Sequence, residues 1–216
     1  DIASGHISIQ YGFRGPNYST VSACASSANA ITEGYNHIRY GMFPVIVVGG
    51  SEAAVSPPAM GGFEAMRAMT TRNDDPMTAS RPFDKDRDGF LMGEGCGCLV
   101  LEDLEHAIAR GAKIYGEIVG CGLSSDAYHI TAPHPEGLGA MMCMQRALND
   151  AGLQITDIDH INTHGTSTPA GDTSEAMAIS NLFGEHIKNM PINSIKSMTG
   201  HLLGGSSAIE AIATVM

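Results

Sequence analysis

Short apolar runs rich in β-branched residues alternate with longer segments of helical periodicity along most of the 216-residue chain. The short runs predict strands over residues 19–23, 45–49, 96–101, 114–122, 160–163 and 191–194. The longer segments predict helices over residues 26–39, 58–69, 104–110, 138–151, 172–183 and 200–216. This alternation is typical of layered α/β folds, in which helices cover the faces of a sheet.

Composition places the chain among globular proteins and narrows its partners. Hydrophobic residues make up 43% of the chain and charged residues 16%, which suits a large buried core. Twelve Lys and Arg against 23 Asp and Glu give a net charge of −11, whereas nucleic-acid binding requires a basic face. No apolar run is long enough for a membrane span, and no export signal is visible. We therefore expect no nucleic-acid or membrane partner and a cytoplasmic location.

The cysteines also bear on the compartment. The five residues, Cys24, Cys96, Cys98, Cys121 and Cys143, are odd in number and form no CxxC pair. A disulfide framework or a zinc knuckle is therefore not indicated, and we predict no metal site. The chain lacks an initiator Met and stops within an apolar helical run, which predicts a piece of a longer polypeptide.

The first stretch with chemical potential surrounds Cys24, in the sequence Val-Ser-Ala-Cys-Ala-Ser-Ser-Ala. A predicted strand ends in small residues, and a helix begins at once with Cys24 at the junction. Unpaired N–H groups and the positive end of the helix dipole favour the reactive thiolate there. The alternative interpretation is a buried structural cysteine, since cysteine is a common core residue.

The second stretch, Asn-Thr-His-Gly-Thr-Ser-Thr-Pro-Ala-Gly-Asp, places His164 at the end of a predicted strand. Thr168 or Asp172 is expected to cap the next helix, and Pro169 suits the first helical turn. The pattern fits either a catalytic histidine or a capped turn with a hydrogen-bonded histidine.

In the third stretch, Lys-Ser-Met-Thr-Gly-His, Lys196 and His201 flank a turn that enters a glycine-rich helix. Small residues at 204–207 allow that helix to approach another backbone closely. Glu210 lies on a nearby helical face, where it could pair with Lys196. A solvated lysine and a capping histidine are the alternative.

Taken together, Cys24, HGTSTPAGD and KSMTGH resemble the elongating, synthase II-like β-ketoacyl-acyl carrier protein synthases of the thiolase-like superfamily. The resemblance extends to GFRGPNYST, RPFDKDRDGF and SSDAYH and covers essentially the whole chain. It implies a layered αβαβα architecture with mixed sheets, incomplete in this chain. Residues 1–112 would belong to the N-terminal half with the nucleophile, and residues 113–216 to the C-terminal half with the two histidines.

The resemblance implies an acyltransferase that extends fatty-acyl chains by decarboxylative Claisen condensation. Cys24 matches the nucleophile that receives the acyl group as a thioester. His164 and His201 match the two histidines that donate hydrogen bonds to the malonyl carbonyl oxygen as CO2 leaves. Lys196 and Glu210 match a lysine and a glutamate that we expect to fix geometry and electrostatics.

The resemblance also implies substrate contacts and partners. Thr131, Thr166 and Thr168 would line the pantetheine tunnel, and Arg67 would contact the acidic carrier. The substrates are malonyl and acyl thioesters on the phosphopantetheine of acyl carrier protein, with no further cofactor. The family pairs as a homodimer, so we expect one here.

Other functions remain open. A polyketide-type ketosynthase shares these motifs, and a non-catalytic partner subunit would lack the cysteine that is present here. A thiolase needs a second active-site cysteine, and a binding module without chemistry requires an unreactive Cys24. Family members extend beyond both ends of this chain and carry a later Gly-Phe-Gly-Gly loop that contributes to the acyl pocket. Gly205-Ser206-Ser207 is also less rich in glycine and alanine than the family pattern.

Overall fold

A computed structural model describes residues 2–216. The chain forms two compact units, each assembled from separate stretches. Unit 1 contains residues 2–54, Gly93–Gly116 and Leu202–Met216, and unit 2 contains Val55–Met92 and Glu117–His201. These units are defined by contacts within the chain, so the division at residue 112 stays a prediction.

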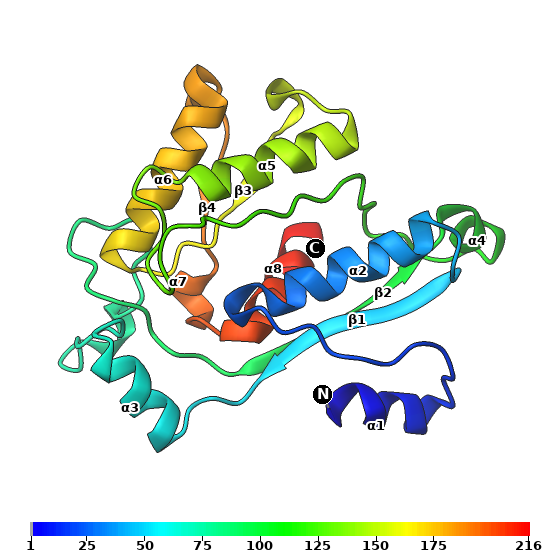
Figure 1. The fold of residues 1–216 in the computed structure, drawn as a ribbon, viewed down its shortest axis with the longest axis horizontal. Helices are drawn as coiled ribbons and strands as arrows, with labels where there is room; N and C mark the ends of the chain where they lie inside the picture. The colour runs from blue at the N-terminus through cyan, green and yellow to red at the C-terminus, as the bar shows by residue number, and fades with distance from the viewer. Residues whose placement is uncertain (1) are drawn as a thin grey trace. The chain divides into compact units, whose positions relative to one another are not determined.

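Unit 1 is built on an antiparallel ribbon of two strands, β1 (Val45–Glu52) and β2 (Gly95–Glu102). Helices α2 (Ser26–Arg39) and α8 (Ser206–Val215) pack on this ribbon (Figure 1). Glycine makes the close packing possible, because a Cβ on Gly97 would lie 2.9 Å from the carbonyl carbon of Ala208 in α8. The unit also contains α1 (Ile2–Tyr11), η1 (Ala23–Ala25), α4 (Leu104–Ala109) and η5 (Leu203–Gly205).

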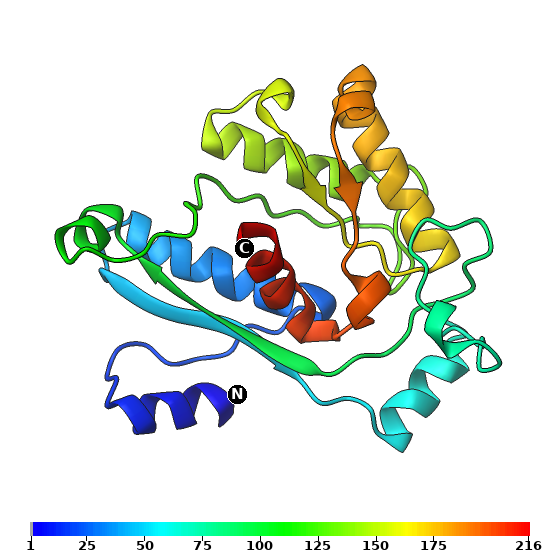
Figure 2. The same ribbon diagram turned by 180° about the vertical axis from the view of Figure 1, so that it is seen from behind.

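Unit 2 contains a short parallel pair, β3 (Ile161–Asn162) and β4 (Ile192–Asn193). Helices α5 (Leu138–Ala151) and α6 (Pro169–Phe183) pack together in this unit (Figure 2). Ile179, Phe183 and Met190 form a buried apolar cluster. The other elements are α3 (Pro57–Ala65), η2 (Pro76–Thr78), η3 (Ile155–Asp157), η4 (Gly184–Asn189) and α7 (Lys196–Thr199).

Most predicted elements are present, and α/β is confirmed as the fold class. Helix α5 has the predicted bounds, and Gly152 ends it at a φ of 70°, as expected for a left-handed helix stop. Two predicted strands, residues 19–23 and 114–122, are wrong for the described part of the chain, where both segments lack strand structure. An apolar run becomes a strand only when a neighbouring strand supplies ladder hydrogen bonds. None of the helices in residues 2–216 combines the length and apolarity needed to cross a membrane.

Candidate active site

His164 follows the end of β3, and both its backbone N–H and its carbonyl group are hydrogen-bonded to charged side chains. The Glu175 carboxylate on α6 accepts the backbone N–H of His164 at 2.6 Å and that of Gly165 at 2.7 Å. The Lys196 ammonium donates to the His164 carbonyl oxygen at 2.5 Å. The strand end and two charged side chains therefore fix the backbone from which this imidazole projects.

Lys196 reaches His164 because β3 and β4 run parallel. Parallel strands end at the same edge of a sheet, so the segments that follow them lie together. Lys196 begins α7, three residues after β4, and is only 1% exposed. A lysine this deeply buried requires polar partners, which include the His164 carbonyl.

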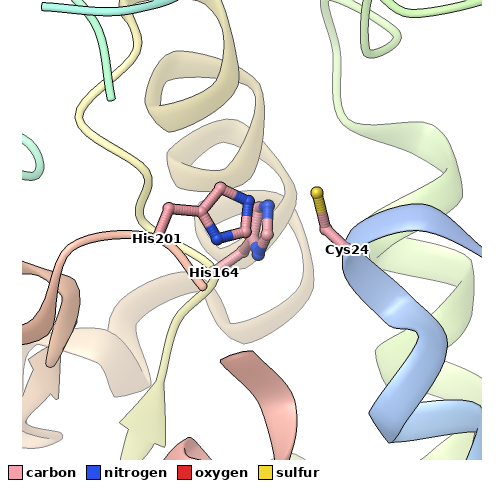
Figure 3. A group of neighbouring side chains, drawn as sticks. All are labelled: Cys24, His164 and His201. Carbon is pink, nitrogen blue, oxygen red and sulfur yellow. The ribbon is translucent and has the colours of Figure 1, made fainter. Parts of the chain in front are cut away.

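The chain reverses after α7 at Gly200, whose φ is 69°, and this turn presents His201. The backbone N–H of His201 donates to the Leu91 carbonyl at 2.7 Å, and its ring contacts Phe90 edge to face with centroids 5.6 Å apart. The rings of His164 and His201 meet nearly at right angles, 5.1 Å apart (Figure 3). Their nearest ligand nitrogens lie within 4.8 Å of one another.

Both imidazoles are held in the neutral form. Burial, then the charges of Lys196 and His201, lower the pKa of His164 to about 3. Burial and Lys196 lower the pKa of His201 to about 3 as well. The side chain of His164 exposes part of its surface to solvent, but neighbouring protein atoms crowd its ring. The nearby Lys196 ammonium also lowers the pKa of His164. A neutral imidazole carries one N–H, so each ring can donate one hydrogen bond at pH 7.

In unit 1, Cys24 lies in η1, the single turn that leads into α2 (Figure 3). The preceding Ala23 has a φ of 50°, a left-handed conformation that is unusual for a residue with a Cβ. Ser26 donates its hydroxyl to the Ala23 carbonyl at 2.8 Å and accepts the Ser22 N–H at 2.9 Å, and so supports this turn. Backbone strain of this kind is often found at functional sites.

The glycine-rich stretch after His201 packs against the cysteine turn within unit 1. Element η5 contacts η1, and the Ser207 hydroxyl donates to the Cys24 carbonyl at 3.5 Å. The Ala208 N–H donates to the Ser27 hydroxyl at 3.1 Å. The predicted close approach of residues 204–207 to another backbone is confirmed. Its partner is the segment around Cys24, and serine takes part in the contact.

The remaining predicted residues are distributed over both units. In unit 2, Thr166 is buried and its hydroxyl lies 3.0 Å from that of Thr168, while Thr131 and Arg67 are exposed. Glu210 is half-buried on α8 in unit 1. Its pairing with Lys196 stays a prediction.

Sequence reasoning missed Glu175 and gave Asp172 only a capping role. Thr168 is the N-cap of α6 and Pro169 occupies its first turn as predicted, but Thr168 makes no side-chain cap bond. Asp172 is 1% exposed and accepts the N–H of Ser167 at 3.1 Å. Acidic residues four and seven positions after Thr168 point back toward the preceding loop, and this spacing was the available signal.

The residue types also bear on metal binding. Two imidazoles alone fall short of the three protein ligands of a catalytic zinc site. A thiol such as that of Cys24 would have to supply the third ligand of such a zinc site. The absence of a metal stays a prediction.

Models of known families match nearly the whole chain. The model described as "Beta-ketoacyl synthase, N-terminal domain" matches residues 1–107, and "Beta-ketoacyl synthase, C-terminal domain" matches residues 115–216. A 3-oxoacyl-[acyl-carrier-protein] synthase 2 from Synechocystis is 55% identical over all of this chain and 52% of its own length. One from Staphylococcus aureus is 52% identical over all of this chain and 53% of its own length.

Solved structures of ketosynthases also resemble this chain. A ketosynthase of a type II polyketide synthase, in complex with its acyl-carrier protein and bound to the hexaketide, matches with a TM-score of 0.96 at 38% identity. That match covers 99% of this chain and 52% of the other. A β-ketoacyl synthase from Burkholderia phymatum matches with a TM-score of 0.91 at 44% identity, over 98% of this chain and 50% of its own.

The fold is the thiolase-like fold of the ketosynthases, as the sequence predicted. The chain belongs to the β-ketoacyl synthase family. It spans about half the length of the curated relatives it matches.

Proposed function

We propose that the protein carrying this chain condenses a malonyl thioester with an acyl group held on Cys24. In the first step the Cys24 thiolate attacks an acyl thioester, and the carrier thiol leaves. In the second, the malonyl group loses CO2, and the electron pair of the broken C–C bond forms an enolate. The enolate attacks the acyl carbonyl, the Cys24 thiolate departs, and the product is a β-ketoacyl thioester two carbons longer.

The observation that carries this proposal is the pair of histidine rings, which meet nearly at right angles with centroids 5.1 Å apart. An enolate places negative charge on the thioester oxygen, and two preorganised N–H donors stabilise that charge as it forms. Imidazoles with a pKa of about 3 keep their single N–H as donors throughout the physiological range. Glu175 and Lys196 fix the backbone of His164, so this donor does not need to reorganise during the reaction.

The proposal includes a shared site for the thiol and the imidazoles. His201 precedes η5 by two residues, and η5 packs on the turn that holds Cys24 within unit 1. If the three groups share a site, carboxamidomethylation of Cys24 will shift the ring resonances of both histidines. Unshifted resonances would argue for separate sites.

The decisive experiment separates the two half-reactions. The variant His164→Ala is expected to retain acyl transfer to Cys24 but to lose malonyl decarboxylation by about a hundredfold or more, as for removal of one oxyanion donor. Unchanged decarboxylation would remove the proposed role.

Iodoacetamide should label Cys24 before Cys143, because burial raises the pKa of the Cys143 thiol. Equal labelling rates would count against an activated thiol.

Acyl carrier protein is the proposed partner, and its phosphopantetheine is the only prosthetic group that the chemistry requires. Arg67 is exposed directly after α3 and could contact an acidic carrier. The variant Arg67→Glu should raise KM for carrier-bound malonate and leave KM for malonyl-pantetheine unchanged. Thr131, Thr166 and Thr168 would contact the pantetheine arm. A homodimer in the cytoplasm completes the proposal, to be tested by sedimentation and cell fractionation.

Fatty-acyl extension is favoured over polyketide assembly. The relatives at 52–55% identity are 3-oxoacyl-[acyl-carrier-protein] synthases, whereas the polyketide ketosynthase is 38% identical. Turnover with saturated acyl carriers, compared with β-ketoacyl carriers, tests this choice.

A further inference from the structure

Ser167 stands between Thr166 and Thr168 in a conformation that serine rarely adopts. Its φ is 70°, and the residue is 0% exposed. A left-handed residue with a Cβ persists only where its surroundings hold it. The flanking threonine hydroxyls meet at 3.0 Å, so this turn sets how the pair is presented.

All three polar groups of Ser167 have partners, and two of these lie in residues 81–89, here named the clamp segment. The Arg81 N–H donates to the Ser167 hydroxyl at 3.0 Å, and the Gly89 N–H donates to its carbonyl at 3.1 Å. The third group, the Ser167 N–H, donates to Asp172 at 3.1 Å. The Phe83 N–H donates to the same carboxylate at 2.7 Å, so Asp172 joins the two segments.

Arg87 extends the clamp beyond Ser167. Its guanidinium donates to the carbonyl oxygens of Thr168 at 3.2 Å and Pro169 at 2.9 Å, and to the Thr173 hydroxyl at 2.9 Å. The planar guanidinium spreads its donors over three nitrogens in a rigid fork, whereas a lysine ammonium presents its three donors from a single nitrogen. His164, in contrast, is held by Glu175 and Lys196, which lie outside the clamp segment.

From these contacts we infer that the clamp segment is a positioning device for the Thr166–Thr168 pair, and that Arg87 and Ser167 are its positioning residues. The inference rests on the proposed function, in which this threonine pair binds the pantetheine arm of the substrate. It adds that recognition of the arm depends on residues about eighty positions away in the chain, whereas the backbone of His164 is held by Glu175 and Lys196.

The test compares malonyl-pantetheine with malonyl methyl thioester, which lacks the arm and its amides, as substrates for decarboxylation by the complete protein. The measured quantity is the ratio of kcat/KM for the two substrates. Arg87→Lys and Ser167→Ala should each reduce the preference for the pantetheine substrate about tenfold, the equivalent of one or two lost hydrogen bonds. The rate with the methyl thioester should stay near the wild-type value.

Arg110→Lys serves as the control, because Arg110 makes a bidentate ion pair with Glu102 in unit 1 and takes no part in the clamp. A retained preference in both variants would overturn the inference, as would equal losses with both substrates. If Arg87→Lys does not fold, Ser167→Ala decides the question. A wild-type protein that decarboxylates neither substrate would instead sink the proposed function.

Discussion

The cysteine turn in unit 1 and the histidine loop in unit 2 are held in place by different physical means. Ala23 is strained, and the residues around Cys24 pack through glycine and serine contacts. His164 depends on two ionisable side chains, Glu175, which is half-buried, and Lys196, which is buried. Changes in volume should therefore disturb the cysteine turn, and changes in charge should disturb the histidines.

The largest effect is expected from Lys196→Met. Breaking a buried charge arrangement by removing one partner costs about 3–5 kcal/mol in unfolding free energy, because the remaining charge is left uncompensated. Here that charge is Glu175, whose pKa burial raises and Lys196 lowers. The loss of stability can be measured by urea denaturation. The pKa of His201 should rise at the same time, because the ammonium helps to lower it.

Lys188→Met is the matched control, since Lys188 pairs with Glu185 on the surface, where both side chains are largely exposed. Surface pairs contribute about 0–1 kcal/mol, so little change is expected. The double variant Lys196→Met, Glu175→Gln should recover part of the lost stability. A Lys196→Met variant as stable as the control would contradict the role assigned to buried charge.

A smaller effect is expected from Gly97→Ala, which tests volume in unit 1. The added Cβ would lie 2.9 Å from backbone atoms of Ala208 and Ile209, so α8 must move away from β2. Overpacking of this kind costs about 1–3 kcal/mol in unfolding free energy. Helix α8 carries Ser207, so the rate of Cys24 alkylation should change as well.

Gly5→Ala is the control for volume. Gly5 lies in α1, where an added Cβ would meet no atom within 4 Å, and alanine favours helix over glycine by about 1 kcal/mol. This variant should therefore be as stable as the parent protein or more so. If Gly97→Ala and Gly5→Ala behaved alike, close packing would not explain how the cysteine turn is held.

The sequence predicted features that a single element determines better than features that depend on tertiary contacts. Local patterns were sufficient where one element determines the outcome, as for α5 with its Gly152 stop or Pro169 at the start of α6. The reactive residue types were visible because Cys24, His164 and His201 stand in distinctive motifs. Glu175 was missed because its spacing from Thr168 indicates only that it points toward the preceding loop. Its contacts with the N–H groups of His164 and Gly165 also depend on where α6 lies relative to β3.

Contacts between residues distant in sequence could not be predicted from local patterns either. Arg87 lies in a polar run that predicts a long loop, and no local pattern shows that its donors reach Thr168 and Pro169. Residues 114–122 show the opposite case, in which a strand-like composition yields no strand among the described residues. In both cases the outcome depends on hydrogen-bond partners distant in sequence.

The smallest expected effect is the contribution of the buried His201 to the pH dependence of stability. With a folded pKa of about 3 and an unfolded pKa near 6.5, His201 binds a proton only in the unfolded state between these values. The unfolded state is then favoured as pH falls, so stability should decrease from pH 6.5 to pH 5. The slope approaches about 1.4 kcal/mol per pH unit for this single group as pH falls below the unfolded pKa.

Burial raises the pKa of Glu175 and Asp172, which gives these carboxyls the opposite sign: their protonated forms favour the folded state as pH falls. The total slope therefore mixes both contributions, and the difference between the wild type and His201→Gln isolates the histidine. Urea denaturation at pH 6.5 and pH 5 should show a shallower pH dependence for the variant. Identical slopes would mean that the imidazole has the same pKa in the folded and the unfolded protein. Burial would then not hold the ring of His201 in the neutral form below pH 6.5, contrary to the contrast with the cysteine turn.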